Sequence, residues 1–252
     1  DMWWDLPGGT GAKYYIPANG SATSLYAGSL WIAGLDINKQ LKCAAIRFRQ
    51  NGNDFWTGPL TIDGTATIDQ VTCMEYDKMY NITRAEVDDF IANCDPVTGR
   101  FMGEEIPSSI ANWPAHGDPS RGMSYYLAPF YDRDKDGDYN PAQGDYPYYD
   151  IDNELCHTKT PTMDESREGS VEGSILADQV IKGDQTIWWV FNDKGNAHTE
   201  TGGSAIGLEI RAQAFAFATN DEINNMTFYS YEIINRSTYT LTNTYFSPWT
   251  DV

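Results

Sequence analysis

Short apolar and aromatic runs separated by turn-forming residues dominate the hydrophobic pattern of this chain. Residues 29–33 and 41–48 are two such runs, and Gly34, Asp36 and Asn38 between them are typical of a turn. Two β-forming runs joined by a short segment of this kind indicate a β-hairpin. We therefore predict paired strands over these two ranges.

The pattern becomes more regular from Gln185 onward, where β-forming runs follow one another at turn-separated intervals. Polar and apolar residues alternate at the start of the run that begins at Leu208, as expected for a half-buried strand. Sequential strands joined by short turns favour an antiparallel meander. The fold class that we predict is mainly β, an antiparallel sandwich or jelly-roll-like sheet with long ordered loops. The runs cover residues 186–191, 208–217, 226–234 and 241–246.

One segment has the signals of a helix instead. Thr83 and Glu86 have the spacing of a capping box, in which a hydroxyl and a carboxylate each accept a backbone N–H at the helix start. The apolar residues on one face of the following segment are Val87, Phe90 and Ile91. Pro96 cannot lie inside a helix. We predict one short helix, near residues 84–93.

The chain has no visible linker, so we interpret residues 1–252 as a single β-rich module. Its loop-rich part covers about 1–182 and the meander about 183–252. No run approaches the roughly 18 apolar residues of a membrane span. Because the sequence begins at Asp1 without an initiator Met, we expect a piece of a larger, processed chain.

Charge and cysteine content limit the partners and the cysteine chemistry that we expect for this module. A formal net charge of −19 argues against nucleic acid as a partner, because phosphate binding needs clustered Lys and Arg. The aromatic content is too high for a disordered acidic tail. The four cysteines, Cys43, Cys73, Cys94 and Cys156, form no CxxC pair. Buried free thiols and disulfides are both open, with Cys73 to Cys94 as the favoured pair because these two residues bracket the predicted helix.

The clearest chemistry lies in residues 132–145, where aspartates occupy alternate positions. Gly137 at the sixth place permits a sharp turn, so that oxygens wrap around one point, as Ca²⁺ requires. Gln143 replaces the bidentate Glu of an EF-hand and no helices flank the loop, but Asp145 can supply the missing carboxylate. The predicted ligands of one Ca²⁺ are Asp132, Asp134, Asp136, Asp138, Asn140 and Asp145.

A solvated acidic turn is the alternative interpretation of this loop. Closely spaced aspartates repel one another unless a cation neutralises them, which favours calcium. Residue 138 holds the seventh place, which usually contributes a backbone carbonyl, so we expect Asp138 to act mainly through its main chain. The spacing resembles the calcium loops of dockerins and thrombospondin type 3 repeats.

No catalytic motif stands out. Asp193 and His198 follow an aromatic run, but a lone His beside an Asp is more often a hydrogen-bonded loop residue than a general base. The GxSxG, HExxH and phosphate-binding glycine motifs are absent. A pair of carboxylates for glycoside hydrolysis stays open, because the sequence does not give their separation.

The segments 1–6, 29–34, 48–60, 132–147 and 183–193 carry a family resemblance. Their order resembles large secreted proteins of Bacteroidetes that use the type IX secretion route and end in a C-terminal sorting domain. The resemblance implies an extracellular, cell-surface location and an N-terminal module followed by further β domains. Residues 148–182 look like an insertion relative to this pattern.

From these observations we expect a non-enzymatic cell-surface module, an adhesin or a component of a surface fibre or layer, stabilised by calcium. Its partners would be other cell-surface proteins or glycans, or further copies of the chain in a homo-oligomer or fibre. The alternative is a carbohydrate-binding or carbohydrate-degrading domain that uses exposed Trp and Tyr side chains.

Overall fold

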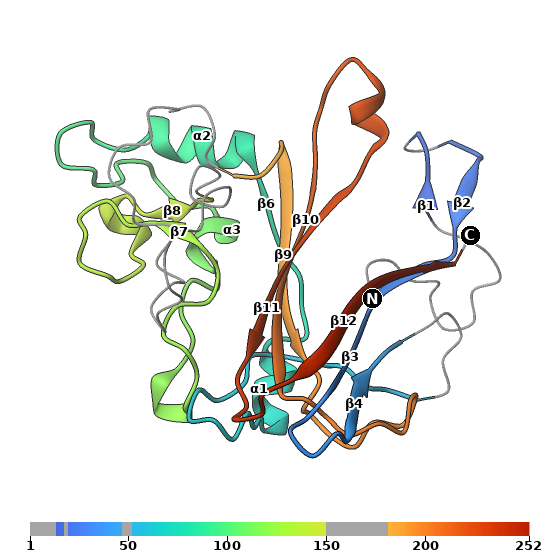
Figure 1. Ribbon diagram of the computed structural model, residues 1–252. Coiled ribbons are helices and arrows are strands. Elements are labelled where there is room, and N and C mark those ends of the chain that lie inside the picture. The colour runs from blue at the N-terminus through green and yellow to red at the C-terminus, as the bar shows by residue number, and fades with distance from the viewer. Residues whose placement is uncertain (1–13, 18–19, 47–51, 150–180, 252) are drawn as a thin grey trace. The chain divides into compact units, whose positions relative to one another are not determined.

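Antiparallel strands dominate the computed structural model, which describes residues 14–17, 20–46, 52–149 and 181–251 (Figure 1). The described residues are mainly β with a few short helices, which confirms the predicted fold class. They form two compact units, and the division falls inside three strands that give residues to both. Unit 1 comprises residues 1–77, 190–210 and 233–252, and unit 2 comprises 78–189 and 211–232.

The strands form several sheets. The strands, in chain order, are β1 (Tyr14–Tyr15), β2 (Thr23–Leu25), β3 (Ala27–Leu35), β4 (Leu41–Ala44), β5 (Trp56–Thr57), β6 (Tyr80–Thr83), β7 (Phe130–Tyr131), β8 (Tyr146–Pro147), β9 (Gln185–Asn192), β10 (Leu208–Ala216), β11 (Phe228–Asn235) and β12 (Thr242–Asp251). The largest sheet has the order β11-β10-β9-β5, with β6 also paired to β9, and a three-stranded sheet has the order β12-β3-β4. The remaining pairs are β1-β2 and β7-β8.

The predicted hairpin is present in unit 1 as β3 and β4, which pair antiparallel. Asp36 forms the turn between them, because its carboxylate accepts the backbone N–H groups of Asn38 and Gln40, each at 2.9 Å. This local hydrogen bonding is the usual reason for Asp at a tight turn. The second strand ends at Ala44, earlier than the predicted residue 48.

The predicted meander is correct for β9, β10 and β11 and wrong for the last strand. β12 leaves that sheet and pairs antiparallel with β3. Asn243, whose φ of 50° is left-handed, lies in an irregularity at the start of β12. The pairing brings the Trp249 ring onto Trp31, with centroids 5.7 Å apart and planes at 8°. Short turns in the sequence do not reveal such a change of sheet.

The predicted helix is α2 (Arg84–Ala92), with both hydrogen bonds of the capping box formed between Thr83 and Glu86. Val87 and Phe90 are buried, and the Phe90 ring stacks on Phe101. The prediction of a single helix is wrong, because two shorter α-helices are also present. Neither has the clear apolar period by which the sequence could reveal it. The additional helical segments are α1 (Gln70–Glu75), α3 (Ser108–Ala111), η1 (Pro119–Arg121), η2 (Pro141–Gln143) and η4 (Glu222–Asn225).

The favoured disulfide is not formed. Cys43, Cys73 and Cys94 are free thiols, and Cys156 lies outside the described residues. Cys73 belongs to the unpredicted helix α1, whereas the Cys94 thiol follows α2 and donates to the Phe90 carbonyl at 3.3 Å. Bracketing the predicted helix therefore does not make these two cysteines partners.

Each unit has an apolar core of its own. In unit 1 the buried side chains include Leu30, Ile32, Leu60, Ile206 and Ile210. In unit 2 they include Ile82, Val87, Phe90, Ile110 and Trp188. None of the helices in the described part of the chain has the length and apolar composition that crossing a membrane requires.

Candidate metal site and buried histidine

The predicted calcium segment forms a closed loop in unit 2, which we call the aspartate loop (residues 132–145). It begins directly after β7 and ends directly before β8, and these two strands pair antiparallel with Tyr131 opposite Tyr146. The pairing holds the two ends of the loop side by side. A loop whose ends are fixed loses less conformational freedom when it closes around a ligand.

Asp132 organises the first half of the loop. Its carboxylate oxygens accept the backbone N–H groups of Lys135 at 2.7 Å and Gly137 at 2.8 Å, so the chain curls around this buried side chain. Both donors have left-handed backbones, with φ of 62° and 88°. Gly137 adopts this conformation without the strain that a side chain would add, as predicted for the sharp turn.

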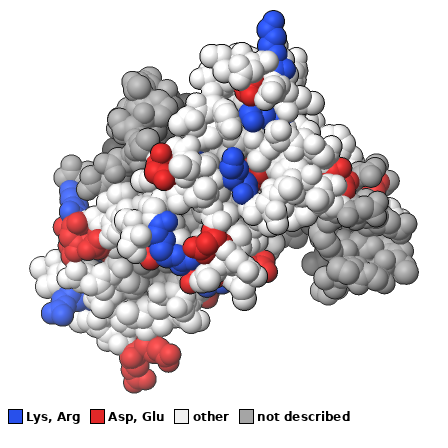
Figure 2. Space-filling view, turned by 90° about the horizontal axis from the view of Figure 1, so that it is seen from below, with Lys and Arg blue, Asp and Glu red and all other residues white. Residues whose placement is uncertain are grey.

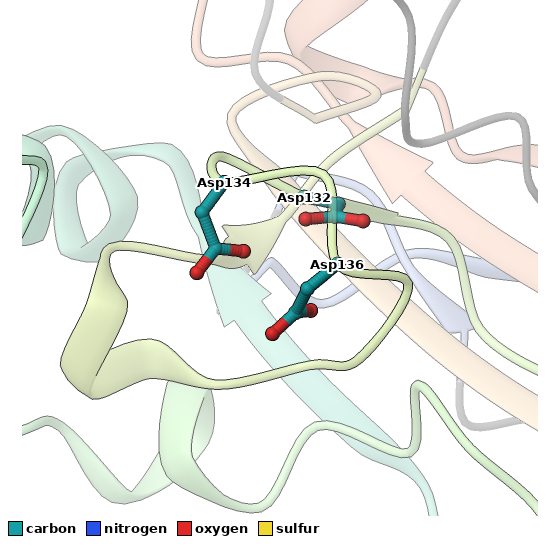
Figure 3. Close-up of side chains that lie close together, drawn as sticks. All are labelled: Asp132, Asp134 and Asp136. Atoms are coloured by element: carbon teal, nitrogen blue, oxygen red, sulfur yellow. The ribbon is translucent and has the colours of Figure 1, made fainter.

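The curled backbone brings three of the predicted ligands together. Asp132, Asp134 and Asp136 each offer one carboxylate oxygen, and these oxygens lie within 4.8 Å of one another (Figure 3). Calcium binds oxygens at about 2.3–2.6 Å, so oxygens on opposite sides of one ion lie roughly 5 Å apart. The spacing of the three carboxylates therefore fits a shared cation.

The other three predicted ligands make contacts of their own. Asp138 accepts a hydrogen bond from the Tyr125 hydroxyl. Asn140 accepts the backbone N–H of Ala142 at 3.1 Å. Asp145, which is fully buried, accepts the N–H groups of Arg133 at 2.9 Å and Asn140 at 2.7 Å. Each of these accepting oxygens has a second lone pair that could bind an ion, so the full ligand set stays a prediction.

The acidic groups of the loop disfavour one another's ionisation. Burial raises the pKa of Asp145 to about 6, and the charges of Asp132 and Asp134 act in the same direction against two backbone hydrogen bonds. The pKa of Asp134 is also raised, by burial and then by Asp136. Carboxylates held together in this way are stabilised by a bound cation.

An aromatic cluster that the sequence did not reveal lies against the loop. We define the His116 cluster as His116, Tyr125, Tyr126, Phe130 and Tyr139. The His116 ring stacks on Tyr125 with centroids 4.1 Å apart, and its Nε2 accepts the backbone N–H of Tyr139 at 2.8 Å. Burial lowers the pKa of His116, which favours the neutral ring. Its members are too scattered along the chain to form a motif.

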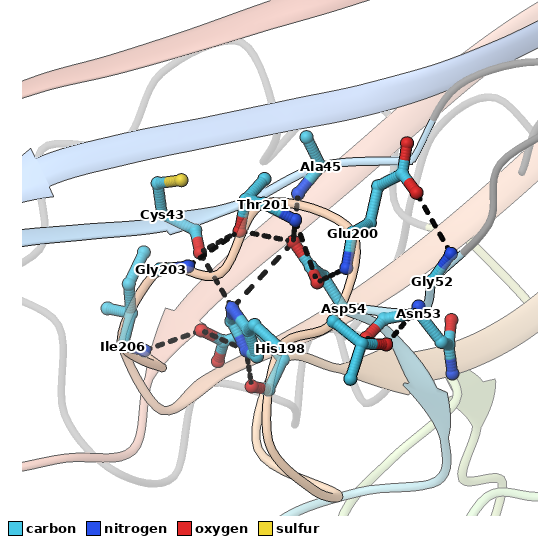
Figure 4. Close-up of polar contacts among 12 residues, drawn as sticks. Cys43, Ala45, Gly52, Asn53, Asp54, His198, Glu200, Thr201, Gly203 and Ile206 are labelled. Atoms are coloured by element: carbon cyan, nitrogen blue, oxygen red, sulfur yellow. Dashed lines mark hydrogen bonds and ion pairs between the residues drawn. The ribbon is translucent and has the colours of Figure 1, made fainter.

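His198, the other candidate, is enclosed in unit 1 (Figure 4). Its side chain has no exposed surface. Nδ1 lies 2.7 Å from the Cys43 carbonyl oxygen, and Nε2 lies 2.6 Å from that of Asp193. Because carbonyl oxygens only accept, both contacts are hydrogen bonds only when the ring is protonated on both nitrogens.

Two buried carboxylates surround this ring, with Asp54 and Asp193 each 3.9 Å from one ring nitrogen. Asp54 accepts from the Thr201 hydroxyl at 2.6 Å and from the backbone N–H of Glu200 at 3.0 Å. Asp193 accepts three backbone N–H groups. Because the His198 ring and both carboxylates are buried and already have hydrogen-bond partners, the geometry supports a structural role for His198.

A pocket of about 430 Å³ lies on unit 1. Trp31 and Tyr245, from β3 and β12, line it together with smaller apolar residues. Its few polar lining residues include Glu200, Thr201 and Ser247. The pocket can take an apolar or aromatic group.

Comparison of the chain with protein-family models, with curated proteins and with solved structures finds no match.

Proposed function

We propose that this chain is a non-enzymatic module of a secreted cell-surface protein and that calcium stabilises it. The observation that carries the proposal is the convergence of Asp132, Asp134 and Asp136, whose carboxylate oxygens lie within 4.8 Å of one another at a loop closed by β7 and β8. Sequence spacing alone predicted this convergence. The loop lies between two elements of unit 2, where an ion would hold it in one conformation.

Calcium is the cation that the donor atoms favour. They are all oxygens, whereas zinc prefers nitrogen and sulfur ligands. His116, which contacts the loop at Tyr139, has both ring nitrogens engaged by Tyr125 and Tyr139. Magnesium demands an octahedral site and gives up its water reluctantly, whereas calcium accepts irregular sets of six to eight oxygens. An irregular loop of carboxylates and carbonyls suits calcium.

The remaining chemistry supports a binding or structural role. His198 is enclosed and cannot reach a substrate without local unfolding. On the face drawn in Figure 2, the described Lys and Arg side chains lie among acidic ones and form no continuous stripe that would suit nucleic acid. The expected partners are other cell-surface proteins, glycans or further copies of the chain.

The extracellular location rests on the resemblance to type IX secreted proteins and on the acidic composition. Extracellular calcium modules commonly bind at about 10⁻⁴–10⁻³ M, and a site with only three converging carboxylates is consistent with this range. An adhesin or a component of a surface fibre or layer would gain rigidity from such an ion.

Carbohydrate binding is the second candidate, and the pocket beside Trp31 and Tyr245 favours it, because sugar rings stack on exposed aromatic side chains. The mostly apolar lining offers few hydrogen-bond partners for sugar hydroxyls, so carbohydrate binding ranks below the calcium-stabilised module. Quenching of Trp fluorescence by a glycan, lost in Trp31→Ala, would move carbohydrate binding to first place.

The test of the calcium proposal is the melting temperature with calcium and with a chelator. Calcium at about a hundred times its dissociation constant should add roughly 2.7 kcal/mol of stability, because the ion binds the folded loop and not the unfolded chain. Asp134→Ala should abolish this difference and leave the β-sheet signal intact. Asp88→Ala, which removes an exposed aspartate of α2, is the matched control and should keep it. Equal melting temperatures in both solutions would leave a solvated acidic turn.

A further inference from the structure

One histidine tautomer connects the second half of the aspartate loop to the rest of unit 2. The backbone N–H of Tyr139 donates to Nε2 of His116 at 2.8 Å, so this nitrogen carries no proton. The ring proton of the neutral imidazole is then on Nδ1, which lies 3.1 Å from the Tyr125 carbonyl oxygen and donates to it. Both bonds are made by the same tautomer, which fixes the orientation of the ring.

Tyr125 holds the neighbouring loop residue. Its hydroxyl donates to the Asp138 carboxylate, and its ring stacks on His116 at 4.1 Å with planes at 17°. A stacked pair of side chains therefore holds two consecutive residues of the loop, one through its side chain and the other through its backbone N–H. The Phe130 ring, just before the loop, contacts His116 edge-on at 5.3 Å.

We propose that His116 and Tyr125 are positioning residues of the calcium site. This inference rests on the proposed function of the aspartate loop. Neither side chain is a predicted ligand. Together they hold the side chain of Asp138 and the backbone N–H of Tyr139, at the seventh place of the loop, whose carbonyl oxygen would bind calcium. A loop segment held before the ion arrives loses less conformational freedom on binding. Supporting groups of this kind typically change metal affinity by about 10- to 100-fold.

The experiment is a calcium titration of the whole chain and of three variants, with melting temperatures measured in calcium and in chelator. His116→Phe keeps an aromatic ring but removes the acceptor for Tyr139, and we expect calcium binding about 10- to 100-fold weaker. Tyr125→Phe removes only the hydroxyl that holds Asp138 and should weaken binding severalfold. His116→Gln, whose side-chain oxygen can accept the Tyr139 N–H, should recover part of the lost affinity.

The control is Trp113→Phe, which removes the hydrogen bond from Trp113 to the Pro129 carbonyl outside the loop. It should lower both melting temperatures equally and leave calcium affinity unchanged. The inference is overturned if His116→Phe and Tyr125→Phe bind calcium as tightly as the unaltered chain, or if they behave like this control. Should His116→Phe not fold, Tyr125→Phe decides alone. An unaltered chain that binds no calcium overturns the proposed function, and this inference with it.

Discussion

Arg236 and Glu209 form a buried ion pair with two contacts in unit 1. Nη2 of Arg236 lies 2.9 Å from Oε1 of Glu209, and Nε lies 3.2 Å from Oε2. Glu209 is fully buried in β10, and its Oε2 also accepts the backbone N–H of Leu60 at 2.9 Å. Removal of the arginine takes away the positive charge that Arg236 places beside this buried carboxylate.

Arg236→Met should therefore destabilise the chain by about 3–5 kcal/mol, as removal of one partner from a buried pair usually does. The measurement is the free energy of unfolding from urea denaturation. Arg100→Met, at an exposed position, is the control and should stay within about 0.5 kcal/mol of the unaltered chain. A loss below about 1 kcal/mol for Arg236→Met would mean that the pair adds little.

The start of α2 depends on two reciprocal hydrogen bonds. The Thr83 hydroxyl accepts the N–H of Glu86 at 3.2 Å, and Glu86 accepts the N–H of Thr83 at 2.9 Å. Thr83→Ala removes the first bond, and with it the bond that the hydroxyl donates to Glu86 at 2.6 Å, and should reduce the free energy of unfolding by about 1 kcal/mol. Thr83→Ser keeps the hydroxyl and should lose much less. If both variants lose equally, packing of the threonine methyl explains the effect.

The same cap predicts a pH dependence. Partial burial acts to raise the pKa of Glu86, but hydrogen bonds from Thr83 and Ser109 outweigh it, and the net pKa lies below the ordinary 4.5. The ionised carboxylate is therefore favoured in the folded state. Its contribution is present above pH 4.5 and is lost as the pH falls through the folded pKa. Urea denaturation between pH 7 and pH 3 should show the Thr83→Ala difference shrinking toward the acid end.

Features whose cause is local in the sequence were predictable. The capping box, the Asp36 turn and the alternation of aspartates in residues 132–136 each depend on neighbours a few residues apart. The pairing of β12 with β3 and the His116 cluster depend on contacts between distant segments. No alternation or motif encodes which distant edge a strand will join.

The same distinction between local and distant contacts applies to the candidate metal site. The convergence of Asp132, Asp134 and Asp136 follows from one turn of chain, so spacing predicted it. The hydrogen bond from Tyr125 to Asp138 joins residues that no loop rule connects. The spacing of the aspartates assigns each predicted ligand a place in the loop. Contacts with the surrounding fold decide which of these side chains bind other groups instead.

Without calcium, the contribution of the aspartate loop to stability should change with pH in the direction opposite to that of the Glu86 capping box. The pKa of Asp145 is raised from 3.8 to about 6, so its protonated form is favoured in the folded state. The resulting stability is present below pH 3.8 and is lost as the pH rises through 6. In chelator, the aspartate contribution should make the chain more stable at pH 5 than at pH 7. With calcium the order should reverse, because the ion binds the ionised form.

The comparison is made on melting temperatures in chelator and in saturating calcium, with Thr83→Ala as the background to reduce the cap's own pH dependence. A calcium-induced rise that is equally large at pH 5 and pH 7 would mean that Asp145 does not ionise on binding and is not a ligand.

Asp193 closes a loop of unit 1 by accepting three backbone N–H groups. Oδ2 accepts from Ile206 at 2.5 Å, and Oδ1 accepts from Gly207 at 2.8 Å and Leu208 at 2.7 Å. The carboxylate is fully buried. It therefore holds the start of β10 next to the end of β9.

Asp193→Asn should reduce the free energy of unfolding by at least about 2 kcal/mol, because one oxygen becomes an NH₂ group that faces a buried N–H. Either orientation of the amide leaves at least one backbone donor unsatisfied, and His198 also loses a neighbouring negative charge. Urea denaturation measures the loss, with Asp88→Asn on the surface of α2 as the control for the substitution itself. Since the aspartate loop lies in unit 2, the calcium-induced rise in melting temperature should be unchanged. A stable Asp193→Asn variant would mean that backbone pairing alone closes this loop, and it would reopen a chemical role for the Asp193 and His198 pair.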